Sequence, residues 1–65
     1  MDADTALTHI TRELNEKVIQ LQEALADGRV DTFEEYKKVC GEVKGLLTAR
    51  EYVMDLKRRL ERSDE

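Results

Sequence analysis

Residues 25–35, LADGRVDTFEE, contain the stop signal of one helix and the start signal of the next. Gly28 stands where a left-handed C-terminal cap is needed, a conformation that glycine adopts at little steric cost. Thr32 and Glu35 have the spacing of a capping box, and Asp31 with Glu34 offers a shifted alternative. Only three residues, 28–30, remain for the turn. So short a link predicts that the two helices are antiparallel neighbours.

The segment before this turn has the pattern of an amphipathic helix over residues 4–27. Its apolar residues recur in steps of three and four, which places them on one stripe of a helix. Asp4 or Thr5 can cap the first turn. The stripe consists of Leu7, Ile10, Leu14, Val18, Leu21 and Leu25.

The segment after the turn predicts a longer helix over residues 31–62, because it contains no proline. At about 1.5 Å per residue this helix is about 45 Å long, against about 35 Å for the first. Its broad apolar side consists of Tyr36, Val39, Cys40, Val43, Leu46, Leu47, Val53, Met54 and Leu60. The sequence therefore predicts an all-α fold: one domain over residues 1–65, an antiparallel two-helix hairpin with a longer second helix.

The expected register of the two helices follows from a turn centred near Arg29. It places Val43 opposite residues 16–18 and Met54 near Leu7. Beyond Met54 the second helix is expected to have no partner within its own chain, so that its last apolar residues are exposed or meet another subunit.

Arg50 falls in the middle of the apolar side of the second helix, where an unpaired charge is costly. The expected register places it near His9 and Glu13. We expect an ion pair with Glu13 or Asp55, with the arginine stem packed over apolar neighbours. An arginine that binds a phosphate or a carboxylate is the alternative.

The size of the chain argues for association. A domain of 65 residues buries only about 60% of the surface that its unfolded chain exposes, and usually needs a disulfide, a metal or a partner. One cysteine, Cys40, and one histidine, His9, exclude an internal disulfide and a four-ligand structural zinc site. We therefore expect the hairpin to be oligomeric or partner-bound.

Several classes of function are disfavoured by composition. The net charge of −4 argues against a general nucleic-acid binder, although Lys57, Arg58, Arg59 and Arg62 form a local basic cluster. The acidic start lacks the pattern of a secretory signal, and no stretch has the roughly 20 apolar residues that cross a bilayer, so a soluble protein is expected. The carboxylates lie on solvated faces, and a hairpin offers no concave site. We expect no enzyme, no cofactor and no metal site.

Gly41, Gly45 and Ala49 recur every four residues on the second helix. Each glycine in a helix interior costs about 1 kcal/mol relative to alanine, so two of them ask for a reason. Small residues at this spacing let another backbone approach closely. The stripe extends toward apolar residues near the end of the helix, and the predicted partner-binding set is Gly41, Gly45, Ala49, Tyr52, Leu56 and Leu60. Alternatively, these are tolerated glycines that bend the helix or ease packing within the hairpin.

A longer part of the chain resembles a known group of proteins. The segment LADGRVDTFEEYKKVCGEVKGLL, residues 25–47, precedes Ala49 and an apolar helix over residues 53–60. The turn, the acidic and aromatic helix start, Cys-Gly and the second Gly before Leu resemble small helical proteins encoded among the head-assembly genes of tailed bacteriophages. The resemblance covers roughly residues 20–60. It implies a structural protein of the virion or of head assembly, bound in many copies to capsid, portal or connector proteins and found in the virion or the host cytoplasm.

Two other classes of function stay open. One is a regulatory binder that inhibits or chaperones a host or phage protein. The other is a weak DNA-binding dimer that uses the basic cluster of residues 57–62. Co-purification with particles, a one-to-one complex with a soluble enzyme, or a salt-sensitive shift of duplex DNA separates the three.

Overall fold

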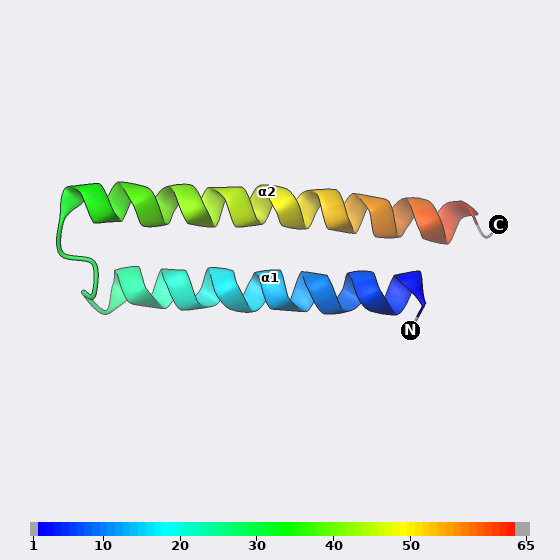
Figure 1. Ribbon diagram of the computed structural model, residues 1–65, viewed down its shortest axis with the longest axis horizontal. Helices are drawn as coiled ribbons and strands as arrows, with labels where there is room; N and C mark the ends of the chain where they lie inside the picture. Colours follow the sequence, from blue (N-terminus) through cyan, green and yellow to red (C-terminus); the bar gives the residue numbers. More distant parts are fainter. Residues whose placement is uncertain (1, 64–65) are drawn as a thin grey trace.

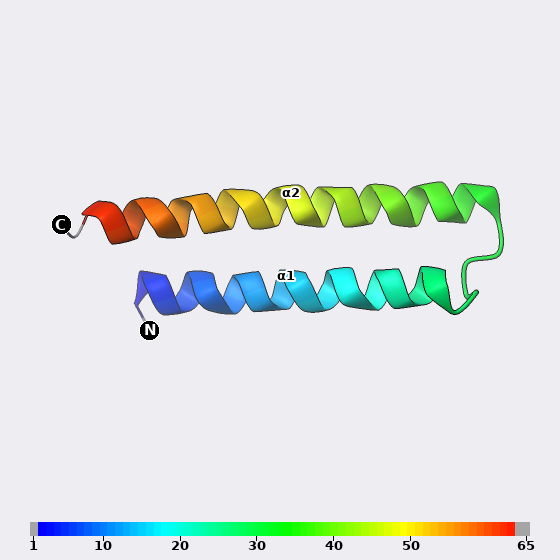
Figure 2. The ribbon, with the colours of Figure 1, turned by 180° about the vertical axis from the view of Figure 1, so that it is seen from behind.

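The computed structural model of the chain describes residues 2–63, which form two antiparallel helices packed side by side (Figure 1). Helix α1 spans Ala3–Ala26 and α2 spans Phe33–Ser63, with 24 and 31 residues. The pair measures 50 × 17 × 14 Å. Seen from either side, α2 extends past α1 at both ends (Figure 2). The predicted all-helical hairpin with a longer second helix is confirmed.

The connection between the helices is longer than expected, because it comprises residues 27–32 and not 28–30. Of the two possible caps, the structure uses Thr32, whose Oγ1 accepts a hydrogen bond from the backbone N–H of Glu35 at 3.1 Å. A capping residue stands just outside its helix, so α2 begins at Phe33 and not at residue 31. The turn therefore includes Asp27, Asp31 and Thr32, which were predicted to lie in the helices.

Helix α1 begins one residue earlier than expected, because Asp2 caps it in place of Asp4 or Thr5. The Asp2 carboxylate accepts a hydrogen bond from the backbone N–H of Thr5 at 2.8 Å. This hydrogen bond to the charged form lowers the pKa of Asp2 below its ordinary value. Asp2 thus supplies an acceptor for one of the unpaired N–H groups at the positive end of the helix.

Helix α1 ends as predicted, with Gly28 in a left-handed conformation, φ 82°. The backbone N–H of Arg29 donates to the carbonyl of Ala24 at 3.2 Å, which is the long-range bond of a Schellman cap. The Asp27 carboxylate accepts from the Arg29 side chain at 3.0 Å, and that bond lowers the pKa of Asp27. The cap and this local pair fix the direction in which the chain leaves α1.

Gly28→Ala and Gly41→Ala are expected to change stability in opposite directions. An added Cβ meets no atom within 4 Å at either position, so only backbone conformation distinguishes them. In the left-handed turn alanine costs about 1 kcal/mol of unfolding free energy. In the helix interior at Gly41 it adds about 1 kcal/mol. Urea unfolding of both variants beside the wild type measures the two changes; a stabilised Gly28→Ala protein would contradict the cap.

The interface between the helices encloses very little. Among residues 2–62 only Val18 is buried, with 5% of its surface exposed. The other apolar residues along the contact are half-buried, because two rods cover only a narrow strip of each other. Large apolar side chains that are 36–73% exposed are Ile10, Ile19, Phe33, Tyr36, Tyr52, Met54, Leu56 and Leu60. The hairpin therefore leaves eight large apolar side chains exposed and, among residues 2–62, buries one.

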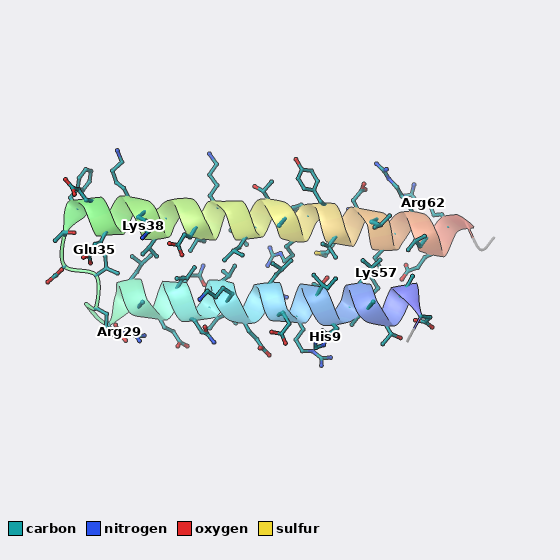
Figure 3. All side chains as sticks on the ribbon, viewed as in Figure 1. His9, Arg29, Glu35, Lys38, Lys57 and Arg62 are labelled. Atoms are coloured by element: carbon teal, nitrogen blue, oxygen red, sulfur yellow. The ribbon has the colours of Figure 1, made fainter. Side chains whose placement is uncertain are left out.

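Two polar contacts define the register of the helices. Arg50 Nη1 donates to Asn15 Oδ1 at 2.7 Å, and Lys57 Nζ donates to Thr8 Oγ1 at 2.8 Å. The two contacts lie seven residues apart in each helix, as one antiparallel register requires. Figure 3 shows Lys57 pointing from α2 toward α1, whereas His9 points away from α2.

This register corrects the sequence-based one. The expected ion pair of Arg50 with Glu13 or Asp55 is wrong, because Arg50 contacts Asn15. Met54 was expected to be the last partnered residue of α2, yet the Lys57 contact shows that pairing continues beyond it. The physical reason is the longer turn, which slides α2 so that each of its positions faces a later position of α1.

Candidate interaction surface

The predicted partner-binding residues lie on the outside and one flank of α2. By the 100° step of a helix, Gly41, Gly45 and Tyr52 point away from the side that carries Arg50. Gly41 and Gly45 are exposed, and a Cβ built on either would meet no atom of the chain within 4 Å. Packing within the hairpin therefore gives no reason for the two glycines. Their contact with a partner remains a prediction.

The same set continues toward the end of α2 as an apolar flank. Ala49 is half-buried, whereas Tyr52, Leu56 and Leu60 are exposed to 73%, 47% and 36%. Ile10 of α1, also exposed, lies on the same flank by its helical angle. The glycine stripe and this apolar flank form one continuous surface of the hairpin.

A second surface, on the opposite flank, was missed by the sequence analysis. It contains a groove of about 600 Å³ between the helices, lined by Thr8, Thr11, Arg12, Asn15, Glu16, Ile19, Met54, Lys57, Arg58 and Glu61. A hollow of about 490 Å³ follows along α2, lined by Cys40, Val43, Lys44, Leu47, Thr48, Arg50 and Glu51. We call the flank that carries both the grooved face. The sequence contained a sign of this face in Ile19, an apolar residue that lies outside the predicted stripe of the first helix.

Arg50 is the least satisfied polar group between the helices. Its Nη1 reaches Asn15, a neutral acceptor, while its Nε is buried without a hydrogen-bond partner. Among residues 2–62 Arg50 forms no ion pair, so its charge is not compensated by a carboxylate of the described chain. A poorly paired charge in a contact region lowers stability relative to an apolar side chain of similar size.

The basic cluster near the end of α2 is largely engaged within the chain. Arg59 pairs with Asp55 at 2.9 Å, and Arg58 approaches the same carboxylate at 3.8 Å. Lys57 points inward to Thr8. Arg62 lies in the last turn of α2, where a cation complements the helix dipole.

Cys40 and Tyr36 occupy neighbouring turns of α2. Cys40 is half-buried at the hollow of the grooved face. A side-chain hydrogen bond with Cys40 raises the pKa of Tyr36, and the charge of a thiolate acts in the same direction. His9 approaches Glu13 at 3.8 Å on an exposed side of α1, far from Cys40 along the hairpin. No nucleophile and base are brought together here.

The described residues contain no group of three or more metal-ligating side chains and no helix that could span a membrane. Comparisons with protein-family models, with curated proteins and with solved structures find no match to this chain.

Proposed function

We propose that this chain is a small structural or interaction protein whose hairpin is completed by another protein chain. The observation that carries the proposal is the contrast, among residues 2–62, between one buried side chain, Val18, and eight large apolar side chains that stand exposed. Moving such a side chain out of water contributes about 1.5–3 kcal/mol, so a covering partner is a strong source of stability. Binding to the folded hairpin stabilises it by mass action.

The proposal extends to a role as a bacteriophage virion or head-assembly component that docks on capsid, portal or connector proteins. Its support is the resemblance of residues 25–47 to small phage proteins. The exposed stripe of Gly41 and Gly45 offers such a partner a place where a second backbone can come close. The role requires no catalysis, cofactor or metal.

Gly45→Leu is expected to abolish partner binding while leaving the hairpin folded. A side chain at position 45 meets nothing in the chain, but a partner that packs on the stripe would be pushed away. Gly45→Ala is the matched control, because it adds one carbon and should bind nearly as the wild type. Co-sedimentation of tagged full-length protein with phage heads measures binding, and circular dichroism measures helicity.

The same samples separate the other functions. Recovery of the wild type with heads, lost only with Gly45→Leu, supports the proposal. A one-to-one complex with a soluble enzyme, or a salt-sensitive shift of duplex DNA, would replace the head-assembly role by a regulatory or DNA-binding one. Equal recovery of both variants would remove the glycine stripe from the interface.

A further inference from the structure

Arg50 lies where the groove and the hollow of the grooved face meet. It lines the hollow, and its hydrogen-bond partner Asn15 lines the groove. The arginine side chain is half-buried, so part of it reaches the outside of the hairpin. A ligand that covers the grooved face therefore meets this arginine.

The guanidinium of Arg50 has donors left for such a ligand. Of its five N–H groups, one at Nη1 is used by Asn15, and the one at Nε is enclosed without an acceptor. The second N–H of Nη1 and both N–H groups of Nη2 donate to no atom among residues 2–62. These three donors lie at the tip of the side chain, where the two oxygens of one carboxylate can be bound side by side.

The hairpin prepares Arg50 to bind an anion. It forms no ion pair with any carboxylate of residues 2–62. Folding has already removed part of the water around its guanidinium, so an arriving carboxylate displaces less solvent from the arginine and gains a charge-assisted hydrogen bond. The carboxylate supplies the counter-charge that the neutral Asn15 does not.

The grooved face has a charge opposite to that of the remaining chain. The residues that line the groove and the hollow include five basic and three acidic side chains, a net charge of +2. The face stays positive, at +1, when Asp55 beside Arg58 is counted with it. Because the whole chain has a net charge of −4, the remainder has −5 or −6. An acidic partner is therefore attracted to this face and repelled elsewhere.

The apolar residues between these charges favour a protein over a nucleic acid as the partner. Val43 and Leu47 line the hollow, and Ile19 and Met54 line the groove. A nucleic-acid backbone offers phosphates and no apolar side chains, and the strongly acidic remainder of the hairpin repels it. A helix with an apolar face and carboxylates beside it matches both the apolar lining and the charge.

We infer that the grooved face binds an acidic amphipathic helix of another protein, with one of its carboxylates bound to Nη1 and Nη2 of Arg50. Lys44, exposed at the rim of the hollow and without an ion pair among residues 2–62, adds a second positive charge there. The inference rests on the proposed function, a hairpin completed by another protein chain, and gives the chemistry of a partner at a surface other than the glycine stripe.

Arg50→Met and Arg59→Met separate this site from a general effect of charge. Both variants have the same net charge, but Arg59 comes nine residues after Arg50, on the opposite side of α2, and lines neither the groove nor the hollow. The probe is a labelled synthetic helical peptide with leucine on one face and glutamate beside it, titrated with the full-length protein in fluorescence anisotropy. Arg59→Met should bind the peptide like the wild type, and Arg50→Met about tenfold or more weakly.

Lys44→Gln and a second peptide keep the test independent of folding. Lys44 is exposed, so glutamine leaves the hairpin intact and should weaken binding only a few-fold, as an exposed ion pair does. A peptide with glutamine in place of glutamate should bind the wild type as weakly as the acidic peptide binds Arg50→Met. Circular dichroism measures the helicity of each variant. Equal affinity of the acidic peptide for the wild type and Arg50→Met, or of both peptides for the wild type, would overturn the inference.

Two further outcomes separate this inference from other partners and from the proposed function. Tighter binding of a single-stranded oligonucleotide than of the peptide, lost in Arg50→Met, would overturn the carboxylate in favour of a phosphate. Recovery with heads that depends on Gly45, without binding of the peptide, would overturn the inference and leave the proposed function standing. Binding of the peptide through Arg50, without recovery with heads, would support the inference and remove the head-assembly role.

Discussion

A hundredfold dilution of the wild-type protein is expected to lower its melting temperature by about 10 °C, on the basis of the unfolding enthalpy usual for two chains of this size. The physical reason is the nearly empty core. Val18 alone is buried among residues 2–62, and the eight exposed large apolar side chains can be covered only by association. Loss of the neighbour on dilution therefore removes stability.

Circular dichroism at 222 nm, with path length adjusted to concentration, measures this shift. A melting temperature that does not move with concentration, in a protein that sediments as a monomer, would show that the two helices suffice. That result would count against an obligatory partner.

Replacing Arg50 by Met together with Asn15 by Leu is expected to raise the free energy of unfolding by about 1–4 kcal/mol. Arg50 Nε is buried without a partner, and Nη1 meets only the neutral Asn15. Methionine keeps the unbranched stem and removes the desolvated charge, while leucine removes the amide that would otherwise be left without its donor. Urea unfolding of the double variant beside the wild type gives the change.

The same substitutions should loosen the register of the helices. The contact of Arg50 with Asn15 and that of Lys57 with Thr8 lie one heptad apart, and both are lost or strained when α2 slides by a turn. With only the Lys57 contact left, interhelical nuclear Overhauser effects should show more than one alignment. A destabilised double variant would mean that Arg50 contributes more than it costs. Loss of head binding without a loss of stability would favour the alternative in which Arg50 binds a phosphate or carboxylate of a partner.

Local signals in the sequence were sufficient to predict the two helices. Gly28 ends α1 in the left-handed conformation that its position predicted, and the spacing of Thr32 and Glu35 marks the start of α2. These features depend on neighbours within four residues, which the sequence displays directly. The choice between Thr32 and Asp31 as cap was open in the sequence, and it changed the turn length.

That small local difference had a long-range effect on the candidate surfaces. Because the turn is longer than predicted, Arg50 contacts Asn15 and not Glu13, and α2 contacts α1 beyond Met54. The glycine stripe needed only the periodicity of one helix, so Gly41 and Gly45 could be placed from sequence. The grooved face draws on both helices, and Ile19 lies beside Met54 only once their register is known.

By itself the sequence determined two amphipathic helices, the stop and start between them, and an excess of apolar surface, because these follow from periodicity and capping along a continuous stretch. The tertiary structure decided which residues of α1 meet which of α2. That choice sums weak contacts over the whole length of the hairpin, and the two polar contacts at Asn15 and Thr8 mark the alignment that results.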